Sequence, residues 1–206
     1  MKAEELELLK RYFPEASVGM VGGIFTQRRF KLYFKRPRTS KLGDFRPPRT
    51  PNGICSITLN LDLNPYQMLI TYVHEVAHYD VYQHYGSRRV QPHGQEWQTS
   101  FSTLLQPFLT EAIFPKDVLA ALQKHLKHIK ASSTADQNLQ RVLHKYDKNQ
   151  ATVTTLESLP NGARFVLKNG LVFQKGEKQR TRYKCYCETN GRWYFVAALA
   201  EVQLLQ

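Results

Sequence analysis

The segment His74-Glu75-Val76-Ala77-His78 combines two imidazoles and a carboxylate at a spacing that suits metal chemistry. Four residues of an α-helix advance about 400°, so the two histidine rings lie one turn apart and roughly 40° apart on one face. Both rings can then bind one Zn²⁺ at about 2.0–2.1 Å. Glu75 projects about 100° away from His74, which suits a general base acting on a metal-bound water better than a third ligand.

A catalytic zinc needs a third protein ligand and one open position. His84 is the first candidate, since it occupies the place of the third histidine in the metzincin pattern. That pattern requires glycine where this chain has Val81. On a continuous helix His84 lies about 9 Å beyond His78 along the axis and points roughly 120° away. We therefore expect His84 to be a surface or packing residue.

Two further candidates lie beyond this helix. Glu96 would correspond to the downstream carboxylate ligand of some zincins, but the Asp that typically follows it four residues later is Ser100 here. His93 follows a helix that ends at Gly86 and a short loop, so the chain can turn back and direct this ring towards the metal. We favour His93 as the third ligand. Glu96, on the same face, is a candidate to hydrogen-bond one of the ligating histidines, and the alternative is an ordinary solvated charge.

The helix that carries the motif has clear boundaries in the sequence. Asn64 is a good N-cap, Pro65 suits the first helical position, and Gly86 suits the position after the last turn. One apolar stripe would anchor the helix in the core, and it consists of Ile70, Val73, Ala77 and Val81.

Hydrophobic periodicity predicts the neighbouring elements. Alternating apolar residues indicate strands at Phe30–Lys35 and Ile54–Leu63. The segment Lys41–Arg49, which contains Gly43 and two prolines, is expected to be a turn or loop. Further helices are expected at Ala3–Phe13, His93–Leu109 and Pro115–His128.

The motif and the segment after it resemble the SprT-like zinc metalloproteases, which include the eukaryotic Spartan proteases. His78 is followed fifteen residues later by His93, within the segment Pro92-His93-Gly94-Gln95-Glu96-Trp97. Here His93, Gly94 and Trp97 match the H-G-x-x-aromatic signature of that family. The resemblance covers roughly residues 20 to 125.

This resemblance implies a zincin-like fold, zinc bound by His74, His78 and His93, and Glu75 as the catalytic base. It also implies proteolysis associated with DNA, including removal of proteins crosslinked to DNA. By analogy with zincins, the edge of the strand Ile54–Leu63 would hold the substrate peptide by backbone pairing.

After Gln150 the chain changes character, because three Asn-Gly pairs alternate with short apolar runs. This is a strong hairpin signal, and four or five short strands in about 55 residues predict a small β-barrel. Many SprT-like proteins carry a zinc ribbon at this place, with two Cys-x-x-Cys pairs. Here only Cys185-x-Cys187 is present, which excludes a four-cysteine zinc site within one chain. We expect both cysteines to be buried.

These elements predict an α+β fold class in three parts. Residues 1–130 would form a zincin-like metalloprotease domain with a small sheet and active-site helices, 131–150 a linker or short helix, and 151–206 a small all-β, barrel-like module. A length of 206 residues suffices for one ordinary domain and a small module.

Composition bears on the compartment. The three cysteines fit a reducing environment, and no window approaches the roughly 18 continuous apolar residues of a membrane span. The charged N-terminus lacks the apolar core of a secretory signal. We therefore expect a cytoplasmic protein with no membrane partner.

The formal net charge of +12 favours an anionic partner. Nine basic residues lie between Arg28 and Arg49, opposed only by Asp44, and a second basic cluster surrounds Arg182. Aromatic residues lie among both clusters, a combination that suits single-stranded or disrupted nucleic acid. The candidates for nucleic-acid contact are Arg28, Arg29, Lys31, Lys35, Arg36, Arg38, Arg180, Arg182 and Lys184.

The sequence therefore predicts a zinc-dependent endopeptidase that holds one catalytic Zn²⁺ and acts on proteins at or near DNA. The alternative is a nucleic-acid-binding regulatory protein whose zinc site is structural or only weakly active. A third hypothesis is a zinc hydrolase of a non-peptide substrate.

Overall fold

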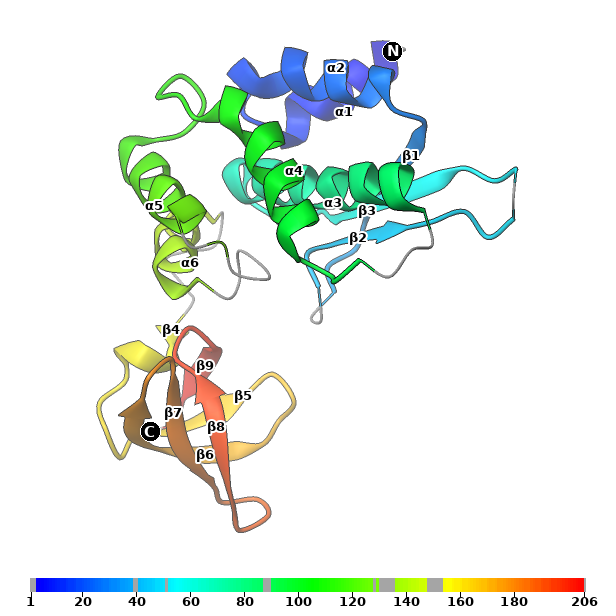
Figure 1. The fold of residues 1–206 in the computed structure, drawn as a ribbon. Coiled ribbons are helices and arrows are strands. Elements are labelled where there is room, and N and C mark those ends of the chain that lie inside the picture. The colour runs from blue at the N-terminus through cyan, green and yellow to red at the C-terminus, as the bar shows by residue number, and fades with distance from the viewer. Residues whose placement is uncertain are drawn as a thin grey trace. The chain divides into compact units, whose positions relative to one another are not determined.

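The computed structural model describes residues 3–38, 41–50, 52–86, 90–127, 129, 136–147 and 154–205. The chain divides into two compact units, Met1–Asp147 and Lys148–Gln206 (Figure 1). The α-helices that the structure describes all lie in the first unit, together with a three-stranded sheet, whereas the second unit is built on a six-stranded sheet. The predicted α+β class is confirmed at this level.

The first unit contains six described α-helices and two short 3-10 helices. The 3-10 helices are η1 (Glu15–Ser17) and η2 (Gln106–Phe108). The α-helices are α1 (Ala3–Tyr12), α2 (Val18–Gln27), α3 (Pro65–Tyr85), α4 (Gln95–Leu105), α5 (Lys116–Lys127) and α6 (Gln137–His144).

The sheet of the first unit has the order β1-β3-β2, with β1 at Phe30–Lys35, β2 at Gly43–Arg46 and β3 at Cys55–Asn60. Strand β1 runs parallel to β3, and β2 runs antiparallel to it. Both edges of β3 are therefore paired. The prediction that a substrate peptide pairs with the edge of this strand is wrong, because β1 and β2 already occupy its backbone groups.

Two elements were not expected from the sequence. Strand β2 lies in the segment predicted as turn or loop, where glycine and aspartate give a weak strand signal. It forms because it pairs with β3, from Gly43 opposite Leu59 to Arg46 opposite Ser56. Helix α2 contains three glycines, which lower helix propensity. It forms because Val21 and its neighbours are buried in the core.

Helix α3 is the central element of the first unit. It contacts β2 and β3 on one side and α4 on another (Figure 1). Eleven of its residues are buried, and they include Leu69, Ile70 and Val73. The Asn64 side chain caps its N-terminus by accepting the Gln67 N–H at 2.9 Å, and Gly86 ends it with a φ of 61°. The predicted boundaries of this helix are confirmed.

Asn64 also connects α3 to α6. Its side-chain amide donates to the Leu143 carbonyl at 3.0 Å and to Asp147 Oδ1 at 2.6 Å. Leu139 and Leu143 of α6 are buried in the core of the first unit. The described part of the segment predicted as a linker or short helix, residues 136–147, thus belongs to this unit.

The second unit is a six-stranded antiparallel sheet in the order β4-β9-β5-β6-β7-β8. A 3-10 helix, η5 (Leu156–Ser158), follows its first strand. The strands are β4 (Thr154–Thr155), β5 (Arg164–Leu167), β6 (Val172–Gln179), β7 (Arg182–Cys187), β8 (Arg192–Ala197) and β9 (Glu201–Leu204).

The predicted closed barrel is wrong, because this sheet is open. Strand β4 has only two residues and pairs with β9 alone among the described strands, so no ladder joins it to β8. The three Asn-Gly glycines adopt left-handed φ values of 70° to 80°. Gly170 and Gly191 lie in the β5–β6 and β7–β8 hairpin turns, as predicted. The hairpin predicted at Gly162 is wrong, because this turn joins η5 to β5 and the preceding strand, β4, pairs with β9. Cys185 and Cys187 are fully buried, as predicted. No helix in the described ranges is both long and apolar enough to cross a membrane.

Replacement of Asn64 by Ala should lower the free energy of unfolding by about 2–3 kcal/mol, because it removes a helix cap and leaves the buried Leu143 carbonyl of α6 without this donor. The measurement is urea unfolding followed by circular dichroism of the helices. Asn138→Ala is the matched control, since Asn138 is exposed on α6 and should shift stability by less than about 0.5 kcal/mol. Equal effects of the two changes would show that Asn64 does not link the helices.

Candidate metal centre

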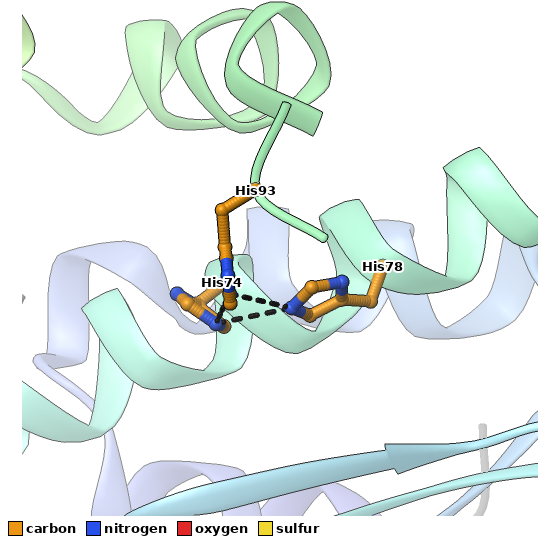
Figure 2. A group of neighbouring side chains, drawn as sticks. All are labelled: His74, His78 and His93. Atoms are coloured by element: carbon orange, nitrogen blue, oxygen red, sulfur yellow. Dashed lines mark hydrogen bonds between the residues drawn. The ribbon is translucent and has the colours of Figure 1, made fainter. Parts of the chain in front are cut away.

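The three predicted ligands, His74, His78 and His93, lie together in the structure (Figure 2). Their Nε2 atoms are 3.2 Å apart between His74 and His78, 3.0 Å between His78 and His93, and 3.1 Å between His93 and His74. Among the histidine, cysteine and acidic side chains of the described residues, these three histidines form the group that could hold a metal ion.

The triangle of nitrogens fits a metal better than it fits hydrogen bonding. A neutral imidazole carries one N–H, so three Nε2 atoms at mutual contact cannot all be paired as donor and acceptor. Three nitrogens bound at about 2.0–2.1 Å to a tetrahedral ion would lie about 3.3–3.4 Å apart, close to the spacing found here. Three protein ligands also leave the fourth corner open.

Two different elements bring these rings together. His74 and His78 are one turn apart on α3, as the motif predicts. His93 precedes α4 and has a φ of 61°, a left-handed conformation that is uncommon for a residue other than glycine. Gln98 donates from its side chain to the His93 carbonyl at 3.0 Å and holds this backbone against the first turn of α4. The expected helix thus begins at Gln95, after the ligand, rather than at His93.

Trp97 packs against all three histidines. Its ring centroid lies 4.6 Å from that of His74, 5.5 Å from His78 and 4.7 Å from His93. Its indole N–H donates to the His74 carbonyl at 3.3 Å, and Phe101 stacks on the Trp97 ring at 4.9 Å. Trp97 is fully buried and therefore supports the three rings. This supporting role was not predicted from the sequence.

Burial controls the charge of the histidines. It lowers the pKa of His74 to about 3, with a further contribution from the neighbouring His78 and His93 rings. Burial likewise lowers the pKa of His78 to about 4 and lowers that of His93. All three rings are therefore neutral at physiological pH, which is the form that coordinates metals.

Glu75 is buried on the side of α3 that faces the sheet. It is 6% exposed, and its carboxylate accepts a hydrogen bond from the backbone N–H of Phe45 in β2. Burial raises the pKa of Glu75 to about 8, against the effect of this hydrogen bond and of the cations Lys41 and Arg38. The Glu75 carboxylate thus lies beside the edge strand of the sheet.

The other two ligand candidates lie outside the histidine group. His84 is exposed and packs its ring against Tyr85, as expected. Glu96 is in the first turn of α4, next to His93 in the chain, but among the described residues no hydrogen bond joins it to any of the three histidine rings. Trp97 and Gln98 instead donate to the backbone carbonyls of His74 and His93.

Two of the nucleic-acid-binding candidates in the first basic cluster, Arg28–Arg49, bind other residues of the protein through their side chains. Arg28 forms a bidentate ion pair with Asp80 of α3, at 2.7 and 2.8 Å, and Arg38 binds the Asn60 side chain at 2.9 Å. Four other candidates are exposed at the surface, and they are Arg29, Lys31, Lys35 and Arg36. Lys31 and Lys35 flank the exposed Tyr33 on one face of β1.

The second basic cluster is smaller than predicted but adjoins aromatic residues that the sequence analysis missed. Arg180 lies in the turn before β7 with a φ of 55°, so it does not continue the alternation of that strand. Arg182 and Lys184 of β7 are exposed on one face. On the adjacent β8, the same face carries Trp193 and Phe195, which are 59% and 53% exposed. The run of three aromatic residues, Trp193-Tyr194-Phe195, was a usable signal.

Comparison of the chain with protein-family profiles, curated proteins and solved structures found no match.

Loss of one ligand should abolish tight metal binding. His78→Ala and His93→Asn should each weaken zinc binding by more than about 100-fold, because two imidazoles remain. Asparagine is chosen at 93 because it tolerates the left-handed backbone and so removes the ring alone. Competition with a chromophoric chelator gives the affinities. His84→Ala is the matched control and should bind zinc like the unmodified chain; a loss there, or none in His93→Asn, would contradict the site.

Proposed function

We propose that this protein is a zinc-dependent endopeptidase of the SprT-like kind, with His74, His78 and His93 as ligands and Glu75 as general base. The observation that carries the proposal is the convergence of three neutral imidazole nitrogens, with a carboxylate one residue from the first of them. This combination of ligands, base and open corner is the one that zinc peptidases use.

Each residue has a separate task in this mechanism. A bound zinc would lower the pKa of a coordinated water and polarise the carbonyl of the scissile peptide bond. The three imidazoles would hold the ion, and Trp97 keeps their rings in place. Burial raises the pKa of Glu75 to about 8, and the positive charge of a bound zinc would favour its ionised form. A carboxylate oxygen of Glu75 would then receive the proton of the attacking water and deliver it to the leaving amide nitrogen.

The substrate strand would pair with β2 rather than with β3. The Asn60 N–H donates to the Leu42 carbonyl at 2.9 Å, which makes these two residues a hydrogen-bonded pair. Such pairs alternate along an antiparallel ladder, so Gly43 and Phe45 direct their backbone groups away from β3, to the edge that no described strand pairs with. The Phe45 N–H is bound to Glu75, so both backbone groups of Gly43 and the Phe45 carbonyl are available to a substrate peptide. This edge runs past Glu75, so a peptide added there lies beside the base.

The variant Glu75→Gln separates the proposed enzyme from a protein with a structural zinc site. It should reduce cleavage of an unfolded protein substrate by at least about 1,000-fold while leaving zinc affinity within about threefold, because the amide keeps the shape but cannot accept the proton. Cleavage is followed by gel electrophoresis and zinc by chelator competition.

The control for this change is Glu111→Gln, an exposed glutamate whose loss should leave cleavage intact. Full cleavage by Glu75→Gln would remove Glu75 from the mechanism. If the unmodified, zinc-loaded chain cleaves no protein, with or without DNA, the regulatory alternative replaces the peptidase.

We further propose that single-stranded nucleic acid contacts the second unit. The exposed face shared by β7 and β8 combines two cations with two aromatic rings, and the Lys184 ammonium lies 4.8 Å from the Trp193 ring centroid. Tyr186 packs beside Trp193 at 5.3 Å. Exposed rings beside cations allow bases to stack while phosphates are neutralised. Residues 154–205 contain eight Lys and Arg against four Asp and Glu, so this unit is itself cationic.

A single-stranded oligothymidylate should quench the fluorescence of Trp193 and bind more weakly as salt rises, because stacking reports on the ring and counterions compete for the phosphates. Trp97, the other tryptophan, is buried and should not respond. Phe195→Ala should weaken binding by about tenfold. Leu204→Ala, an exposed apolar residue on β9, is the control. Equal binding by both variants, or no quenching, would contradict this contact.

A further inference from the structure

The Glu75 carboxylate lies against a glycine of the edge strand. A Cβ built on Gly43 would be 2.6 Å from Glu75 Oε1 and 2.8 Å from Glu75 Cγ, and 2.7 Å from Cγ2 of Thr71, one turn earlier on α3. Real Cβ atoms essentially never show contacts below 3.0 Å. Any residue larger than glycine at this position would therefore have to displace the carboxylate, the helix or the strand.

The requirement for glycine here is steric and does not come from the backbone. The glycines with positive φ in the described chain are Gly86, Gly162, Gly170 and Gly191, so Gly43 has a conformation open to other residues. Gly43 is buried and paired with Leu59 as an ordinary strand residue. What is special about Gly43 is the close approach of α3 to β2, at the point where Glu75 projects from the helix.

The neighbouring residue on the free edge binds the same carboxylate. Phe45 N–H points away from β3 and donates to Glu75. The Phe45 ring packs against Tyr79 and Tyr82 on α3, with centroids 6.3 and 5.8 Å apart, and keeps the strand close to the helix. Two residues of β2 thus affect the Glu75 side chain. Gly43 leaves space for the carboxylate, and the Phe45 N–H donates a hydrogen bond to it.

We propose that Gly43 is a positioning residue for Glu75: the absence of a side chain lets the carboxylate lie against β2, where Phe45 N–H fixes its orientation. This inference rests on the proposed function, since positioning matters for chemistry only if Glu75 is the base. Strand β2 would then orient Glu75 in addition to pairing with the substrate. A displacement of about 1 Å at a reacting group can reduce a rate by about 100-fold. A single methyl group at position 43 should therefore lower the rate of catalysis.

Gly43→Ala tests the proposal in the full chain. The variant should lower kcat for an unfolded protein substrate by about 10- to 100-fold, with KM and zinc affinity within about threefold of the unmodified chain, because the atoms nearest to the added methyl belong to Glu75 and Thr71 and not to a histidine ligand. Gly23→Ala is the matched control: Gly23 lies in α2, and a Cβ there meets nothing within 4 Å. An unchanged kcat in Gly43→Ala would overturn the proposal.

Amide hydrogen exchange gives a readout that does not depend on activity. Phe45 N–H should exchange slowly in the unmodified chain although it faces the free edge. It should exchange at least about tenfold faster in Gly43→Ala, which displaces its acceptor, and in Glu75→Ala, which removes it. The Thr58 amide, in the ladder between β2 and β3, is the internal reference. Exchange at Phe45 that is equal in all three proteins would overturn the proposal.

A double-mutant cycle covers the case in which Gly43→Ala folds poorly. If the added methyl collides with Glu75, Gly43→Ala should lower the unfolding temperature less in the Glu75→Ala background than in the unmodified chain. Equal losses in both backgrounds, or failure of the double variant to fold, would show that glycine is needed for reasons other than Glu75. Absence of cleavage by the unmodified chain would instead contradict the proposed function while these two measurements still test the contact.

Discussion

The candidate site depends on the burial of α3 between two different neighbours. Successive residues of a helix point about 100° apart, so His74 and Glu75 cannot face the same element. Because β2 and β3 cover one side of α3 and α4 another, the imidazoles meet His93 and Trp97 while the carboxylate meets β2. Buried apolar residues on the same helix prevent it from rotating. The packing of the helix thus determines which group can bind a metal and which can move a proton.

The proposed third ligand, His93, has an unfavourable backbone conformation, which the surrounding contacts stabilise. A left-handed backbone at His93 is unfavourable for a side chain with a Cβ, by about 1–3 kcal/mol. Gly94 follows as the N-cap of α4, Gln98 holds the His93 carbonyl, and Trp97 packs under the ring. These contacts come from the first turn of α4, so the start of that helix fixes the ligand. The spacing of His93, Gly94 and Trp97 follows from this arrangement, since Gly94 caps α4 and Trp97 in its first turn packs against the His93 ring.

Much of this arrangement could be predicted from the sequence, and the remainder depended on contacts between distant residues. Asn64, Pro65 and Gly86 mark the ends of α3 through local chemistry, and the His74–His78 spacing predicts a shared face. Strand β2 could not be predicted because its pairing with β3, not its own residues, makes it a strand. The same holds for the open sheet of the second unit, since Asn-Gly turns specify hairpins but not whether the outer strands meet. The resemblance to SprT-like proteases remains a prediction.

Strand β2 has a further consequence at the level of whole molecules. An unpaired strand edge is a template on which other copies of a chain can aggregate, and natural proteins protect such edges by keeping them short and charged. Strand β2 has four residues, and the cations Lys41, just before the strand, and Arg46, at its end, lie 2.7 and 2.6 Å from Asp44. Only Gly43 and Phe45 direct backbone groups outward, and the Phe45 N–H is already bound to Glu75. Two copies of the chain therefore gain few hydrogen bonds by pairing along this edge.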